Sequence, residues 1–110
     1  MLLDVALGAF AAHGLKGRLG PDMLQVFETG ARYQAYHALA LVAVGLIAAR
    51  WPSPAVDRAG WCFLGGIVLF SGSLYALALT GEKRLGMITP AGGLLFLIGW
   101  ALLAFARLRA

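Results

Sequence analysis

The chain has 110 residues, of which 61% are hydrophobic and only 13% are charged. This length allows one domain, and the composition is too apolar for an ordinary soluble protein or a disordered one. The net charge of +4 does not indicate nucleic-acid binding, because the basic residues flank apolar runs and form no basic cluster interleaved with aromatic residues. We therefore expect the lipid bilayer to be the main partner of the chain, and we expect no binding to nucleic acid.

The first apolar segment, about residues 1–15, is shorter than a membrane span. Its uncharged part, Val5–Leu15, would measure about 17 Å as a helix, whereas the hydrocarbon core of a bilayer is about 30 Å thick. Asp4 precedes this run and would be costly at membrane depth. We expect a first helix that is inserted only in part, or that residues upstream complete. Gly8 and Ala12 form a small-xxx-small pair suited to close helix packing.

The segment that follows, residues 21–32, is amphipathic and too short to span a bilayer. Pro21 suits the first turn of a helix, Phe27 belongs to the apolar side, and Glu28 and Arg32 lie on the polar side. This pattern predicts a helix that lies at the membrane interface.

The second span is predicted over residues 33–49, which is the lower limit of length for a transmembrane helix. Its first turn is polar and aromatic, and Tyr33 and Tyr36 suit the headgroup region. Its second half is apolar throughout. A direct continuation of the interfacial helix into this span remains open.

The third span is predicted over residues 59–81, the longest uncharged run in the chain. As a helix it would cover roughly 34 Å, and it lacks the polar face that a soluble helix of this length requires. A tight loop over residues 50–58, with Pro52 and Pro54, separates it from the second span.

The fourth span is predicted over about residues 86–106, where Thr89-Pro90 either starts the helix or kinks a longer one. The third and fourth spans share a Gly-Gly-x5-Gly spacing. This spacing favours close helix–helix packing, and a ligand cleft along the same glycines is the alternative. The predicted packing positions are Gly8, Ala12, Gly65, Gly66, Ser71, Gly72, Ser73, Gly92, Gly93 and Gly99.

Two histidines flank the first two predicted spans, and antiparallel packing would bring them to the same side of the membrane. They suggest a shared metal or haem iron, or a proton path, with a hydrogen-bonded structural cluster as the alternative. Two histidines without a carboxylate at ligand spacing favour the structural interpretation, so we expect no metal and no cofactor. The predicted polar cluster is His13, Glu28, Arg32, Tyr33, Gln34, Tyr36 and His37.

Four runs of sequence resemble, in order and spacing, a family of small bacterial inner-membrane proteins: GAFAAHGLKG (8–17), YQAYHALAL (33–41), LFSGSLYALALTG (69–81) and ITPAGGLLFLIGW (88–100). The family is the YgdD-like one, domain of unknown function 423, with a mitochondrial relative among the transmembrane proteins. The resemblance covers nearly the whole chain. It implies four membrane helices and no activity, and members usually carry further apolar residues before the position of Val5.

Together these features predict one domain over residues 1–110: an all-α integral membrane bundle of four transmembrane helices. The first helix is short or truncated, and a short amphipathic interfacial helix lies between the first and second. We expect a multi-pass, non-enzymatic structural or accessory protein of the bacterial inner membrane, packing as a homo-oligomer or in a larger complex. A small-molecule or proton carrier, or a haem- or metal-binding subunit using His13 and His37, is the alternative. Similar numbers of basic residues on the two sides leave the orientation open.

Overall fold

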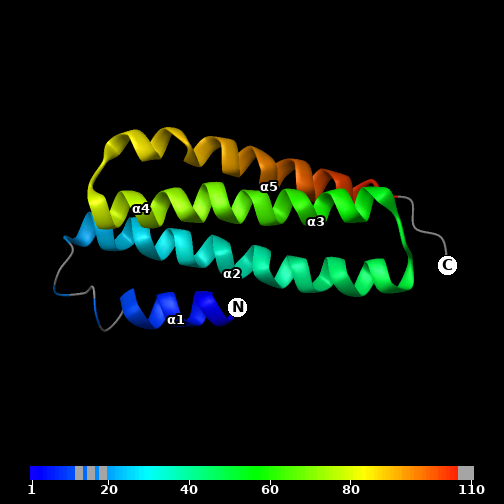
Figure 1. Ribbon diagram of the computed structural model, residues 1–110, viewed down its shortest axis with the longest axis horizontal. Coiled ribbons are helices and arrows are strands. Elements are labelled where there is room, and N and C mark those ends of the chain that lie inside the picture. Colours follow the sequence, from blue (N-terminus) through cyan, green and yellow to red (C-terminus); the bar gives the residue numbers. More distant parts are fainter. Residues whose placement is uncertain (12–13, 15–16, 18–19, 107–110) are drawn as a thin grey trace.

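The computed structural model describes residues 1–11, 14, 17 and 20–106. Within these residues all regular structure is helical, so the all-α prediction is confirmed. The helices run antiparallel along a flat bundle whose Cα atoms extend over 52 × 26 × 14 Å (Figure 1). Ala12 and His13, both named in the sequence predictions, lie outside the described residues.

The first two helices are α1 (Leu2–Phe10) and α2 (Pro21–Arg50). α2 is unbroken over 30 residues, so the predicted interfacial helix and second span form one continuous helix. Pro21 lies in its first turn after an extended Gly20, and Trp51 ends it directly before Pro52. No proline follows Pro21 within α2, so the change from an amphipathic to an apolar pattern does not interrupt the backbone.

A second long helix runs from Pro54 to Thr80 and consists of α3 (Pro54–Gly66), the π-helical turn η2 (Ile67–Ser71) and α4 (Gly72–Thr80). It begins at Pro54 and not at Ala59, because Pro54 occupies the first turn after an extended Ser53. It ends at Gly81, whose φ of 73° is the left-handed conformation that glycine adopts readily, and the Gly81 N–H donates to the Leu77 carbonyl at 2.8 Å.

The last helix, α5 (Thr89–Ala104), follows a short 3₁₀ turn, η3 (Lys83–Met87). Pro90 lies in the first turn of α5, so it starts the helix and does not kink a longer one. Two helical segments are long and apolar enough to cross a membrane: Pro54–Thr80, and Lys83–Ala104, which comprises η3 and α5.

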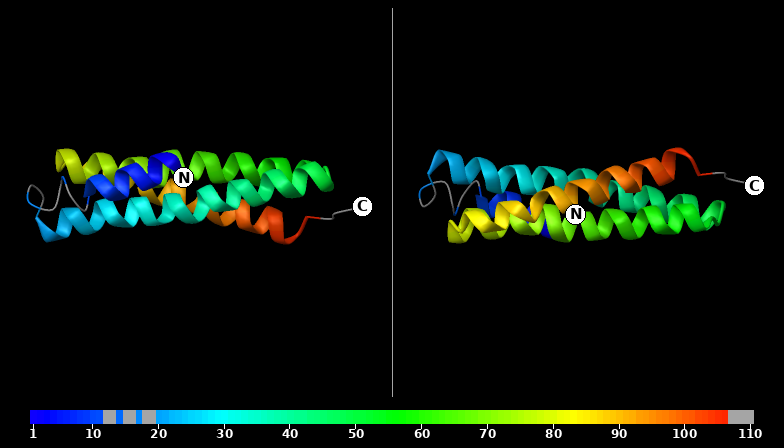
Figure 2. Two further views of the ribbon diagram at one scale, coloured as in Figure 1. Left: turned by 90° about the horizontal axis from the view of Figure 1, so that it is seen from below. Right: turned by 90° about the horizontal axis from the view of Figure 1, so that it is seen from above.

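The long helix Pro54–Thr80 lies between α2 on one side and α5 on the other (Figure 1). α1 lies along the first half of α2, at the end of the bundle that contains α4 (Figures 1 and 2). Two apolar clusters form the core. One joins α2, α3 and α5 and contains Ala40, Val44, Val56, Ala59, Phe63 and Phe96. The other joins α1, α2 and α4 through Ala11, Phe27 and Ala78. Polar side chains occupy the middle of the bundle.

Candidate functional site

His37 is buried on α2, 5% exposed, and each of its ring nitrogens has a partner. Nδ1 lies 2.8 Å from the carbonyl oxygen of Tyr33, one turn earlier, so Nδ1 carries the proton and donates. The indole N–H of Trp100, on α5, donates to Nε2 at 3.0 Å. The imidazole is therefore neutral in this arrangement. A metal ion or haem iron could bind it only by displacing one of these partners.

Aromatic rings from α3 and α5 enclose the imidazole. The Phe96 ring stacks on it with 3.5 Å between centroids and 8° between planes, and the centroids of Phe63 and Trp100 lie 5.6 and 5.9 Å away. Phe63 and Trp100 also contact each other, at 4.8 Å. His37 thus joins the three helices through an aromatic box, which consists of Phe63, Phe96 and Trp100.

Two glycines at the contact between the long helix and α5, Gly66 and Gly99, provide the space for these rings. A Cβ on Gly66 would overlap the ring of Phe96, and a Cβ on Gly99 would lie 2.7 Å from the ring of Phe63. Gly92 differs, because a Cβ there would meet the backbone of Phe70, with its Cα at 2.8 Å. Glycine therefore does two things along this contact: it admits aromatic rings, and at Gly92 it brings two helix backbones together.

A second polar contact ties α2 to η2 and α4. The Ser71 hydroxyl donates to the carbonyl of Gly30 at 2.7 Å, and the Tyr75 hydroxyl donates to Oε1 of Gln34 at 2.5 Å. Gly30 is required for the approach, since a Cβ there would lie 2.9 Å from the Tyr75 ring. Both bonds join residues 41 positions apart in the sequence, so they fix how these helices pack.

A third contact links α4 to the start of α5. Ser73 Oγ donates to the Phe70 carbonyl at 2.9 Å, and the Thr89 and Ser73 hydroxyls lie 2.5 Å apart. Because Ser73 has one hydroxyl proton, Thr89 is the donor in the second bond. Thr89 therefore connects two helices and does not cap its own helix, for which no side-chain cap bond is present.

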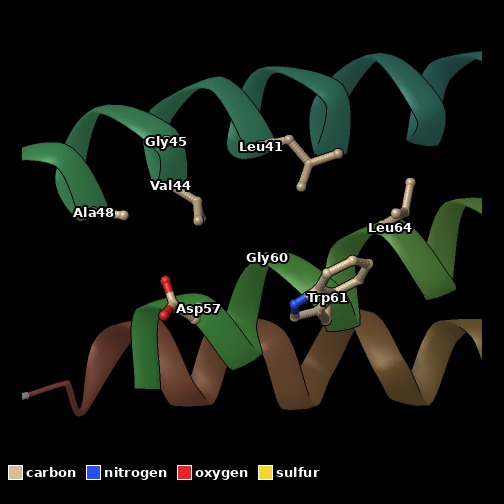
Figure 3. Close-up of a pocket in the computed structure, with 8 residues that line it drawn as sticks. All are labelled: Leu41, Val44, Gly45, Ala48, Asp57, Gly60, Trp61 and Leu64. Atoms are coloured by element: carbon tan, nitrogen blue, oxygen red, sulfur yellow. The ribbon is translucent and has the colours of Figure 1, made fainter. Parts of the chain in front are cut away.

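A surface groove lies between α2 and α3, apart from the aromatic box (Figure 3). Leu41, Val44 and Ala48 reach into it from α2, and Asp57 points into it from the first turns of α3. Its remaining lining residues are Gly45, Gly60, Trp61 and Leu64. Asp57 is the only charged group among these lining residues, so the groove offers no set of polar groups suited to catalysis. No group of three His, Cys, Asp or Glu side chains suited to metal binding occurs among the described residues.

A family model described as "protein of unknown function (DUF423)" matches residues 7–93. The chain belongs to the DUF423 family. It is 49% identical to a UPF0382 membrane protein of Staphylococcus epidermidis, over 98% of this chain and 88% of that protein. It is 48% identical to the UPF0382 membrane protein YwdK of Bacillus subtilis, over 98% of this chain and 89% of that protein. No solved structure matches this DUF423 chain. The family resemblance is therefore confirmed, and neither relative's name states an activity.

The structure of this DUF423 protein distributes the predicted polar cluster over two environments. His37 and Gln34 are buried, whereas Tyr33 is exposed although its ring centroid lies 6.4 Å from that of His37. Glu28, Arg32 and Tyr36 are exposed. The buried pair contacts Trp100, Phe96 and Tyr75, and these partners were not predicted from the sequence. Phe96 and Trp100 are four residues apart on an apolar helix, and this spacing was the one indication in the sequence that they share a helix face.

The predicted packing glycines also separate into two groups. Gly65, Gly66, Gly92, Gly93 and Gly99 lie at the contact between α5 and the long helix. Among the described residues nothing lies within 4 Å of a Cβ built on Gly8 or Gly72. Gly65 and Gly72 do not share a contact, because the π-helical turn η2 lies between them and changes the angular spacing of the residues that follow.

Proposed function

We propose that this DUF423 protein is a multi-pass membrane protein whose four helices form a bundle within the bacterial inner membrane. In this proposal its role is structural: it packs with further copies of itself or with a larger membrane complex, and it catalyses no reaction. The observation that supports a lipid environment most strongly is the outer surface of the bundle. Large apolar side chains stand exposed on every helix, including Leu46 at 69%, Trp61 at 73% and Leu97 at 68%. In water this surface would favour aggregation.

The positions of the charged residues support the same proposal. Arg50, Asp57 and Arg58 lie at one end of the long helices, and Glu82, Lys83 and Arg84 at the other. Between these ends the helix Pro54–Thr80 is uncharged from Ala59 onward. Its 27 residues measure about 40 Å at 1.5 Å per residue, enough for a hydrocarbon core of about 30 Å.

The internal polar groups favour a structural role over a carrier or a haem protein. The hydroxyls of Ser71, Ser73 and Tyr75 each donate to a partner in the bundle, and both nitrogens of His37 are engaged. A carrier needs polar groups that can exchange partners with a substrate, and a haem ligand needs a free nitrogen. The bonds observed here instead join helices, which is what interhelical hydrogen bonds do in lipid.

Gly72 supports assembly with another helix. It was predicted as a packing position, yet a Cβ on Gly72 meets no described atom within 4 Å. A glycine that internal packing does not use leaves a shallow site on a helix surface, where a second helix can approach closely in the membrane. We propose that the face of α4 around Gly72 contacts another copy of the chain or a partner protein.

The test is crosslinking in native membranes followed by mass spectrometry, comparing the wild-type chain with Gly72→Leu. The matched control is Leu46→Phe, which enlarges an exposed side chain on α2, away from Gly72. We expect crosslinked products in the wild type and the control and their loss in Gly72→Leu. A chain that purifies from mild detergent as a monomer without any partner would contradict the assembly proposal. Recovery in the soluble fraction, without detergent, would contradict the membrane proposal.

A further inference from the structure

The one charged residue of α1, Asp4, lies on the buried face of this helix. Leu7 and Ala11 share that face at helical spacing and pack against Phe27 of α2 and Ala78 of α4. Figure 2 shows α1 seated between these two helices. Asp4 is only 9% exposed, so an acidic side chain occupies a position where the pattern of α1 calls for an apolar one.

The carboxyl group of Asp4 is incompletely satisfied. Its Oδ1 atom is buried and has no hydrogen-bond partner among the described residues. The four other acidic residues of the chain are all exposed: Asp22, Glu28, Asp57 and Glu82. An ionised carboxylate without donors is costly in an apolar environment, whereas the neutral acid is tolerated far better. Asp4 is therefore the one acidic residue of the chain whose side chain is buried.

Tyr75, on α4, is the polar neighbour that can respond to the charge on Asp4. Its ring lies 4.8 Å from that of Phe27 and packs against the cluster of Ala11, Phe27 and Ala78, which joins α1 to α2 and α4. The Tyr75 hydroxyl has a single proton, which it donates to Oε1 of Gln34 at 2.5 Å. If Asp4 is protonated, this bond persists. If Asp4 is ionised, its carboxylate competes with Gln34 for the same proton.

We propose that Asp4 is a proton-binding site, and that the Tyr75 hydroxyl donates to Gln34 when Asp4 is protonated and to Asp4 when it is ionised. The step takes up or releases one proton from water and needs no other reactant. The titratable groups on the neighbouring elements are the amino group of Met1, three residues earlier in the chain, and Tyr75 of α4, which packs in the same cluster. From α2 the buried face presents the uncharged Phe27 and Gln34.

Such a site links protonation to helix packing. The Tyr75–Gln34 bond connects α4 to α2, and Asp4 belongs to α1, so transfer of the Tyr75 proton exchanges an α4–α2 bond for an α4–α1 bond. This inference does not depend on the proposed assembly at Gly72, because it concerns contacts within one chain.

The test uses dicyclohexylcarbodiimide, an apolar reagent that reacts with protonated carboxyl groups in apolar surroundings. The carboxylic acid adds across a C=N bond of the reagent, and the adduct rearranges to a stable N-acylurea with no group lost. The full chain in detergent micelles is treated over a range of pH, and the products are located by peptide mapping. We expect one adduct, on Asp4, with the four exposed acids serving as internal controls. This adduct should be absent from the Asp4→Asn variant.

The Tyr75→Phe variant, in which Asp4 is intact, tests whether the Tyr75 hydroxyl donates to ionised Asp4. Because it removes the donor that stabilises ionised Asp4, we expect labelling of Asp4 to persist to higher pH than in the wild type. Tyr36→Phe, at an exposed tyrosine, is the matched control and should leave the profile unchanged. The proton site is overturned if Asp4 is unlabelled at every pH, or reacts no faster than the exposed acids. An unchanged profile in Tyr75→Phe would overturn the role of Tyr75.

Discussion

Replacement of Gly92 by alanine tests the closest helix contact in the bundle. A Cβ at this position would lie 2.8 Å from the Cα of Phe70 and would also overlap its backbone nitrogen. Because the obstacle is backbone, a change of side-chain rotamer cannot relieve it, and the two helices must separate. Overpacking of this kind costs about 1–3 kcal/mol. We expect the upper end of that range, because separation also loosens the contact of Phe96 with Gly66.

Gly72→Ala is the matched control for this experiment. Both substitutions gain the helix propensity of alanine over glycine, about 1 kcal/mol, but a Cβ on Gly72 enters open space among the described residues. The difference between the two variants therefore isolates the steric cost, and we expect Gly92→Ala to be less stable by about 3 kcal/mol. The assay is reversible unfolding in mixed detergent micelles, followed by far-UV circular dichroism. Equal unfolding midpoints would refute the close contact between α5 and the long helix.

Two further predictions concern the buried hydrogen bonds and use the same unfolding assay. Trp100→Phe leaves Nε2 of His37 without its donor and should lower the free energy of unfolding by about 1–3 kcal/mol. Trp61→Phe, at an exposed position, is the control and should lower it much less. Similar losses of stability in both variants would contradict the Trp100–His37 bond. Ser71→Ala removes the bond to the Gly30 carbonyl and should cost about 1 kcal/mol, and wild-type stability in that variant would show that the bond contributes nothing.

The helices themselves were largely predictable from the sequence, because their apolar runs are long and their ends carry charges, prolines or glycines. Two helix boundaries were not predicted from the sequence. Residues 21–32 and 33–49 differ in polarity, and polarity indicates the environment of a helix but not whether its backbone is interrupted. The start at Pro54 was also missed, because Asp57 and Arg58 were assigned to a loop, whereas exposed charged residues are compatible with the first turns of a helix.

The contacts between helices were harder to predict than the helices. The π-helical turn η2 has no residue signature, yet it lies between Gly65 and Gly72 and changes their relative orientation on the helix. The bond between His37 and Trp100 joins residues 63 positions apart, so no local pattern contains it. Asp4 could be recognised in sequence as costly at membrane depth, but which helices cover it depends on how α1 packs.

The central claim, that lipid surrounds the long helices, is tested most directly by nitroxide accessibility in liposomes. Single cysteines are introduced in a Cys62→Ser background at Leu46 on α2, at Leu97 on α5, and at Glu82 as the solvent-exposed control. We expect labels at Leu46 and Leu97 to be relaxed by oxygen, which dissolves in lipid, and to be protected from a water-soluble nickel chelate, with the opposite result at Glu82. Strong relaxation by the nickel chelate at both Leu46 and Leu97 would contradict the account.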